Sequence, residues 1–352
     1  MAAHSIYFPT FGTPVLVGDK LVFAAPEFPG FGSHRLICIA KQDGRKIWEK
    51  TDKKEKMRLW FILNKQLIVT SRDSIQKCDP DSGQFELLYH TGFDQDVYVE
   101  NPQDGTLLVG GAKANVDYLA LVDCNSWRKL WEAPRITGAL AAGQDAILCE
   151  QATRVPVPGG GYSLTDERWL ALSKSNGKVM WQCSCFPTAA GVYPTVVAIS
   201  NFFLVYDLED TIQCLNQRDG TVVSRFKIQK QSDASVQIMA GEQDLLVKTS
   251  QFQISTLQDK SVFFALSVPD LKWHKLSEDK WNRAMRDKFE VRDDSYVYYP
   301  SITPDWQTTI MNRREIKTGH LTELYQEPVP AELRRKPKPE REGLGKLFEP
   351  RY

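Results

Sequence analysis

Apolar and polar positions alternate in short runs along most of the chain, and two of these runs are near copies of each other. Residues 36–48 read Leu-Ile-Cys-Ile-Ala-Lys-Gln-Asp-Gly-Arg-Lys-Ile-Trp, and residues 169–181 read Trp-Leu-Ala-Leu-Ser-Lys-Ser-Asn-Gly-Lys-Val-Met-Trp. In each copy an alternating apolar run meets a polar turn with Gly at the ninth position, and a second run ends in Trp. This pattern predicts a β-hairpin whose glycine supplies the positive φ of a tight turn.

The same hairpin pattern recurs along the whole chain, which makes this a repeat protein. Five copies keep the turn glycine, at Gly44, Gly83, Gly177, Gly220 and Gly319. The two long steps between these glycines each contain one copy without it, at residues 118–131 and 263–273. The sequence therefore predicts seven repeats of about 46 residues, within the period range of solenoids and propellers.

Each repeat opens with two further short apolar runs around a turn, as in residues 14–25. Seven repeats of four antiparallel strands predict an all-β fold, a seven-bladed β-propeller that forms one domain over residues 1–328. The predicted blades cover residues 14–52, 57–92, 96–134, 136–185, 193–228, 235–279 and 289–328. Residues 329–352 are rich in Pro and charge, and we expect them to form an extended tail.

The repeat motif Leu-x-Ala-Leu-(Asp/Ser)-x-x-x-Gly-Lys-x-x-Trp resembles that of the quinoprotein-like (PQQ-like repeat) propellers. That family includes quinone-dependent alcohol dehydrogenases and the assembly lipoprotein of the BAM complex, and the resemblance covers about residues 14–328. It implies that four tryptophans, Trp48, Trp131, Trp181 and Trp273, pack between adjacent blades. The adjacent cysteines that the quinone enzymes carry under their cofactor have no counterpart in this sequence. The resemblance therefore implies a fold without implying a role, and no cofactor is expected.

Composition narrows the possible partners. The 44 basic residues balance the 44 acidic ones, which argues against a nucleic-acid backbone or an anionic membrane as the partner. The first residues do not resemble a secretory signal and no run of 18 apolar residues exists, so we expect a cytoplasmic, monomeric protein. The seven cysteines are scattered, and the one close pair, Cys183 and Cys185, is interpreted as two strand residues on one face rather than a zinc or redox site.

Residues that could carry catalysis are few. The five histidines lie in different repeats without the spacing of metal ligands. The run Gly159–Gly161 lacks the Lys-Ser/Thr of a phosphate loop, and Asp94 with Asp96 makes at most a weak cation site. We therefore predict no catalytic, cofactor-binding or metal-binding residue.

The repeats have grown between their second and third strands, at residues 26–34, 111–117, 153–168, 250–260 and 300–308. In a propeller these connections emerge on one face, and insertions confined to one face usually mark a binding surface. They carry four aromatic residues that we predict to contact a partner, Phe28, Phe31, Tyr162 and Trp306. The alternative is that these rings pack on their own blades.

Residues 277–288 predict a short helix with Ser277 as its N-cap, which either packs Trp281 on a blade or docks a partner. The function favoured by the sequence is a non-enzymatic, protein-binding or scaffold propeller. Two alternatives stay open: an enzyme with a small-molecule site at the mouth of the central channel, and an inhibitor or immunity protein that caps one cognate enzyme.

Overall fold

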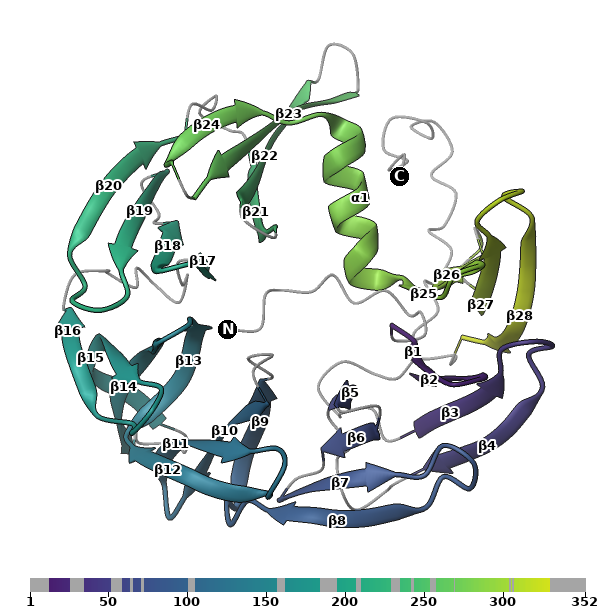
Figure 1. Cartoon of the computed structure of the whole chain (residues 1–352), viewed down its shortest axis with the longest axis horizontal. Coiled ribbons are helices and arrows are strands. Elements are labelled where there is room, and N and C mark those ends of the chain that lie inside the picture. The colour runs from purple at the N-terminus through teal and green to yellow at the C-terminus, as the bar shows by residue number, and fades with distance from the viewer. Residues whose placement is uncertain are drawn as a thin grey trace, which may run out of the picture. The chain divides into compact units, whose positions relative to one another are not determined.

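The computed structural model describes most of the repeat region. The described residues are 13–25, 35–51, 59–63, 66–70, 73–100, 105–156, 162–183, 195–206, 210–228, 235–241, 244–253, 258–268, 270–303, 305 and 307–329. They form seven four-stranded antiparallel sheets, and each sheet is built from four strands that are consecutive in the chain (Figure 1). The predicted seven-bladed β-propeller is confirmed.

Each of the seven blades is made of four consecutive strands. Blade 1 comprises β1 (Val15–Val17), β2 (Lys20–Ala24), β3 (Arg35–Ala40) and β4 (Lys46–Thr51); blade 2 comprises β5 (Leu59–Leu63), β6 (Gln66–Thr70), β7 (Ser74–Cys78) and β8 (Phe85–His90); blade 3 comprises β9 (Gln95–Glu100), β10 (Thr106–Lys113), β11 (Val116–Asp123) and β12 (Arg128–Pro134); blade 4 comprises β13 (Ile136–Ala142), β14 (Ala146–Pro156), β15 (Tyr162–Ser173) and β16 (Val179–Cys183). Blade 5 comprises β17 (Thr195–Ile199), β18 (Phe202–Tyr206), β19 (Thr211–Asn216) and β20 (Val222–Lys227); blade 6 comprises β21 (Ser235–Ala240), β22 (Asp244–Gln253), β23 (Gln258–Ser267) and β24 (Lys272–Lys275); blade 7 comprises β25 (Val291–Arg292), β26 (Tyr296–Ile302), β27 (Thr308–Glu315) and β28 (Leu321–Pro328).

The chain divides into two compact units. The first unit contains blades 3–6 and blade 2 except for its β7–β8 turn. The second unit contains blades 1 and 7 together with that turn, residues 80–83.

The turn glycines have the backbone that the sequence requires. The five turn glycines have φ between +66° and +74°, where a residue with a Cβ is strained. The copy in blade 3 has Trp127 at this position with φ +53°, and its amide donates to the Asp123 carbonyl as the Gly177 amide donates to that of Ser173. A tryptophan therefore takes the strained backbone there, and its ring packs on an apolar cluster shared by blades 2 and 3.

The core consists of layers between neighbouring blades, because side chains alternate between the two faces of each strand. In blade 4, Ile147 and Cys149 pack with blade 3, whereas Leu148 between them packs with blade 5. Blades 3, 4 and 5 are thus apolar on both faces and are covered by their neighbours.

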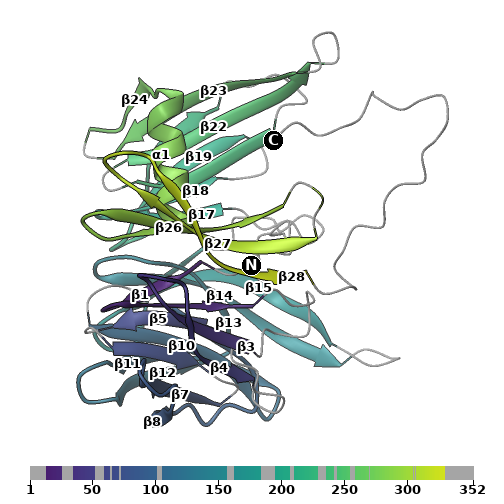
Figure 2. The same cartoon turned by 90° about the vertical axis from the view of Figure 1, so that its right-hand side faces the viewer.

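Three connections that the sequence suggested as loops are strands. In blade 4, β14 and β15 stay paired from Ala146 with Ser173 to Pro156 with Tyr162, and in blade 6 the pairing extends to Gln253 with Gln258. Figure 2 shows these two hairpins projecting on the same side. In blade 3 the expected insertion at residues 111–117 is a two-residue turn, Ala114–Asn115, with positive φ at both residues. Such a turn matches the twist of the strands, so the pairing continues up to it.

The predicted helix is α1 (Glu278–Phe289). The Ser277 hydroxyl accepts from the Lys280 amide at 3.3 Å, which caps its first turn. Trp281 is buried against Phe263 and Met239 of blade 6, so the helix packs its tryptophan on its own unit. No helix among the described residues is long and apolar enough to cross a membrane.

Candidate functional site

The aromatic residues predicted to bind a partner fall mostly outside the described residues. Phe28, Phe31 and Trp306 lie outside them, and of Tyr162 only the backbone is described, as the first residue of β15. The structure therefore places one of these four positions, at the far end of the β14–β15 hairpin opposite Pro156.

The outer part of the β14–β15 hairpin extends beyond the rest of blade 4, and we call residues 153–156 and 162–168 the blade 4 ribbon. The pairing of β13 with β14 ends at Gln151, and the pairing of β16 with β15 ends at Trp169. Among the described residues, neither edge of the ribbon is paired with a third strand. Strand edges that no third strand covers are the usual place for a neighbouring chain to add a strand.

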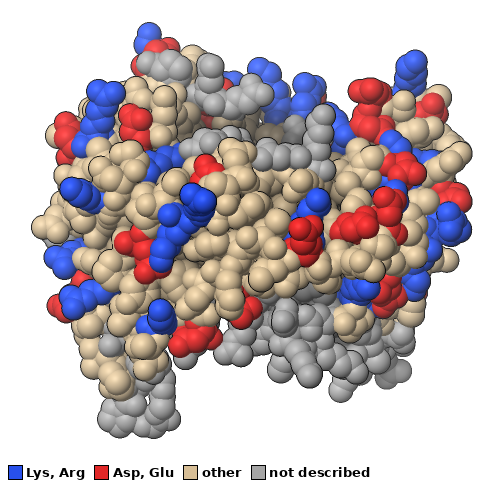
Figure 3. Space-filling view, turned by 60° about the horizontal axis from the view of Figure 1, so that its bottom comes forward, with Lys and Arg blue, Asp and Glu red and all other residues tan. Residues whose placement is uncertain are grey.

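The described side chains of the ribbon are exposed on both of its strands. They are mainly small or polar, and Val155 is the apolar one among them, with 39% of its surface exposed. Asp166 has φ +56°, and the Arg168 guanidinium donates to the Gln151 side-chain oxygen at 2.7 Å. In the ribbon, the acidic Asp166 and Glu167 are followed directly by the basic Arg168. On the face of the molecule drawn in Figure 3, acidic and basic side chains are likewise interspersed. This mixture does not favour a polyanionic partner.

Three predicted inter-blade tryptophans contact the hairpin turn of the next blade in the same way. The indole N–H donates to a backbone carbonyl at 2.9 Å in each case, from Trp48 to Pro80, from Trp131 to Lys174 and from Trp181 to Gln217. Each acceptor lies three residues before a turn glycine, and the ring lies so close to that glycine that an added Cβ would be 2.6–2.8 Å from it.

Trp273 packs in the opposite direction. Its ring meets Phe226 of blade 5 at 6.2 Å and Phe264 of its own blade at 6.1 Å. Both contacts are edge-to-face, which suits the charge distribution of aromatic rings. Trp273 therefore lies between blades 5 and 6.

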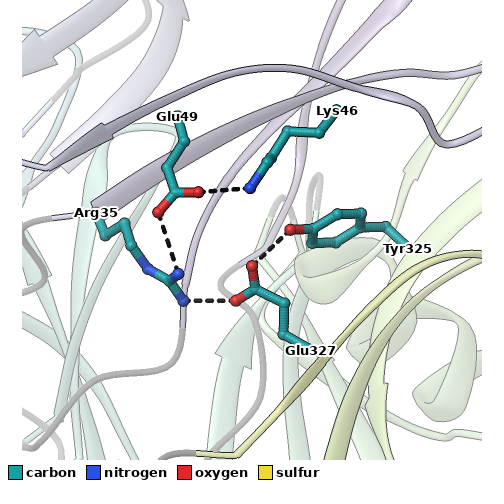
Figure 4. Close-up of polar contacts among 5 residues, drawn as sticks. All are labelled: Arg35, Lys46, Glu49, Tyr325 and Glu327. Carbon is teal, nitrogen blue, oxygen red and sulfur yellow. Dashed lines mark hydrogen bonds and ion pairs between the residues drawn. The ribbon is translucent and has the colours of Figure 1, made fainter.

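The seam between the first and last blades carries a charged network (Figure 4). The Arg35 guanidinium of β3 donates to Glu49 of β4 at 3.2 Å and to Glu327 of β28 at 2.5 Å. Glu49 also accepts from Lys46, and Glu327 accepts from the Tyr325 hydroxyl. The Lys46 hydrogen bond and the nearby Arg35 charge lower the pKa of Glu49 despite its partial burial.

A second ion pair joins the same two blades. Lys41 donates to Asp293 at 2.7 Å, and the Tyr298 hydroxyl donates to the same carboxylate oxygen at 3.0 Å. Burial would raise the pKa of Asp293, but these bonds and those from the Ser295 and Tyr296 amides lower it to about 2. The carboxylate is therefore ionised and held in place, and it serves packing rather than proton transfer.

Glu150 is the buried acidic residue that sequence reasoning missed. It lies on β14 with 7% of its surface exposed, next to Trp169 of β15, and its oxygen Oε1 has no hydrogen-bond partner in the part of the chain that the structure describes. Burial raises its pKa, and the Glu167 carboxylate raises it further, while a long hydrogen bond from Thr137 opposes the shift. The signal in the sequence was a Glu within an apolar strand, Ala146–Cys149, which alternation alone does not single out.

The described residues offer little for metal or thiol chemistry. They contain no group of three His, Cys, Asp or Glu side chains that could hold a metal ion, and the Asp94 carboxylate instead accepts from the Ala114 amide. Five cysteines are free and buried, and burial raises the pKa of the Cys214 thiol to about 12. Cys183 differs from the expectation of a simple strand residue, because it is disulfide-bonded, to a residue outside the described ones.

Comparisons with known proteins give similarity of fold. No family model and no curated protein matches the chain. Among solved structures, it resembles Sqt1 from Saccharomyces cerevisiae (8% identity, 90% of this chain and 85% of that one, TM-score 0.48). It also resembles a quinohemoprotein alcohol dehydrogenase from Comamonas testosteroni (10%, 92% and 68%, TM-score 0.44) and BamB from Moraxella catarrhalis (15%, 67% and 81%, TM-score 0.35).

Two of these structures, the quinohemoprotein alcohol dehydrogenase and BamB, are of the kinds of protein that the repeat motif resembles. At 8–15% identity the matches say nothing about activity. The assignment of the fold rests on the seven sheets of the chain itself.

Proposed function

We propose that this chain is a non-enzymatic binding protein that contacts a protein partner through the long connections between the second and third strands of its blades. The observation that carries this proposal is the blade 4 ribbon, which extends past its own sheet with both edges unpaired among the described residues. Insertions of this kind on a rigid scaffold are where binding residues concentrate.

The physical cost of the ribbon supports this proposal. A two-stranded ribbon with little apolar surface is only marginally stable in water, and an open edge invites unwanted pairing. Charged residues at Asp166, Glu167 and Arg168 and the proline at Pro156 protect these edges against self-association. A partner that adds a strand to an edge of the ribbon, or that lies across the exposed Val155, would stabilise the ribbon by pairing its backbone or burying its apolar surface.

The experiment is affinity capture with a shortened ribbon. Residues 154–164 are replaced by Asn-Gly between Thr153 and Thr165, which pair directly and so flank a two-residue turn. We expect this variant to lose a partner that the wild type captures stoichiometrically. Its melting temperature should stay within about 2 °C, because the described side chains that are removed are exposed.

The matched control is Lys178→Ala, in the turn at the opposite end of the same blade, where the side chain is exposed. Lys20 is a poorer control, because it bridges Asp19 and Asp81 at 2.8 Å each. Retention of the partner by the shortened variant and its loss on Lys178→Ala would contradict the proposal. A small molecule that stays with both variants would favour an enzyme instead.

The predicted aromatic anchors give a finer test of the same face. Phe31→Ala, Tyr162→Ala and Trp306→Ala should each weaken the captured partner by about 1–3 kcal/mol, as truncation of an aromatic anchor does at protein interfaces. Melting temperatures should hardly change. Full affinity in all three variants would exclude these rings as anchors while leaving the backbone of the ribbon as a possible contact.

A further inference from the structure

The seam between blades 7 and 1 is fastened differently from the three seams that use tryptophan. In those seams an indole N–H donates to the carbonyl three residues before a turn glycine. At the last seam the equivalent carbonyl belongs to Lys41, three residues before Gly44. Its donor is the guanidinium of Arg313, at 3.1 Å, which also donates to the Gln42 carbonyl at 2.9 Å. A charged group thus replaces the neutral indole.

The aromatic residue of blade 7 cannot take the tryptophan's place. Tyr325 follows the outer-strand bulge, as Trp48, Trp131 and Trp181 do in their blades. Its hydroxyl is committed to Glu327, and its ring faces Phe23 at 6.1 Å.

Gly44 is covered by the backbone of Leu324, whereas Gly83, Gly177 and Gly220 are covered by tryptophan rings. An added Cβ would lie 1.7 Å from the Leu324 carbonyl oxygen, so the two main chains are in direct contact. Arg313 reaches the Lys41 carbonyl from β27, with its guanidinium 4.7 Å from the centre of the Tyr296 ring.

Two ion pairs cross the same seam. Arg35 pairs with Glu327 and Lys41 pairs with Asp293, and these four side chains are 14–30% exposed. Behind them lies an apolar cluster that both blades share, including Phe23 and Tyr298. Dissolved salt screens partly exposed charges but leaves buried apolar contacts in place. The outer part of this seam therefore depends on ionic strength in a way that an indole hydrogen bond does not.

We propose that charged side chains hold blades 7 and 1 together as a latch. By latch we mean a contact between two blades that loosens at high ionic strength before the contacts made by the tryptophan hydrogen bonds do. Because each blade is made of consecutive strands, no strand is exchanged across this seam among the described residues, and side chains and the contact of Gly44 with the Leu324 main chain hold it. Loosening uncovers the facing sides of blades 7 and 1, so the hydrogen bonds within these two sheets open more often.

Native-state hydrogen exchange of the full chain tests the latch directly. Amides of residues 35–51 and 308–328 are compared with those of residues 169–183 and 211–228, in 0.05 M and 0.5 M NaCl at one pH. We expect the first two segments to exchange about three- to tenfold faster at the higher salt, and the other two to change less than twofold. Equal acceleration in all four segments, or none in the first two, would overturn the proposal.

Two variants separate charge from packing. Lys41→Met breaks the ion pair with Asp293, so it should speed exchange in residues 35–51 at low salt and reduce their response to salt. The matched control Trp181→Phe removes an indole donor, so it should speed exchange in residues 211–228 equally at both salt concentrations. If Lys41→Met does not fold, Arg35→Met breaks the ion pair with Glu327 and makes the same prediction. A wild-type salt response in whichever of these variants folds would overturn the latch.

Discussion

The contact between Trp131 and Gly177 offers a substitution whose effect can be divided into parts. Gly177 has φ +70°, and an added Cβ would lie 2.7 Å from the Trp131 ring. Gly177→Ala therefore has two costs. The left-handed backbone costs about 1 kcal/mol for a residue with a Cβ. Displacing the ring weakens the indole bond to the Lys174 carbonyl and opens a packed site, which together cost about 2 kcal/mol.

Gly105→Ala isolates the first cost, because Gly105 has φ +79° in the same unit but no atom within 4 Å of its Cβ position. Gly319→Ala is a second control, in the same kind of hairpin turn with φ +72° and an equally open site. We expect about 3 kcal/mol of destabilisation for Gly177→Ala and about 1 kcal/mol for each control.

Urea unfolding followed by circular dichroism measures these differences. With an m value of about 3 kcal/mol/M, the midpoint falls by about 1 M for Gly177→Ala and by about 0.3 M for the controls. Equal shifts in all three variants would refute the reasoning, because they would mean that no ring lies against Gly177.

Further predictions concern buried polar and thiol groups. Gln217→Ala should cost about 2–4 kcal/mol, measured by urea unfolding, because it strips a buried hydrogen-bond partner from the Gln144 amide and from two carbonyls. Glu150→Gln should raise stability above wild type at pH 8 by about 1 kcal/mol and lose that advantage near pH 4, because the raised pKa of Glu150 means that folding favours its protonated form. Asp293 has a lowered pKa of about 2, so its carboxylate contributes about 1–2 kcal/mol to the free energy of unfolding above pH 4. This contribution is lost as the pH falls towards 2, and the stability of Asp293→Asn should therefore depend less on pH in this range than that of the wild type. The five free cysteines, Cys214 among them, should not react with a thiol reagent until the protein unfolds.

Much of the fold was predictable because the repeat specifies local structure. Glycine in a polar turn and alternation in the flanking runs each have a short-range physical cause, so seven blades could be counted from the sequence. The direction in which Trp273 packs was not predictable, since it depends on which neighbouring blade offers an aromatic face. The long hairpins of blades 4 and 6 were not predictable either, because their polar, Gly- and Pro-containing sequences read equally well as loops.

The charged seam depends on contacts between residues that are far apart in the chain. Arg35 and Glu327 are 292 positions apart, and no local pattern marks them as partners. The last repeat has Tyr325 where blades 1, 3 and 4 have Trp, so the indole hydrogen bond of those blades is not available at this seam. For the same reason, the burial of the Glu150 carboxylate became visible only once the neighbouring strands were in place.

The central claim is that a protein partner binds the long connections, and the ribbon of blade 4 tests it most directly. Hydrogen exchange of the wild type is measured with and without the partner obtained by affinity capture. The account predicts that residues 146–156 and 162–173 gain protection on binding, while the turn at residues 174–178 does not. Protection of that turn with no change in the hairpin would contradict it.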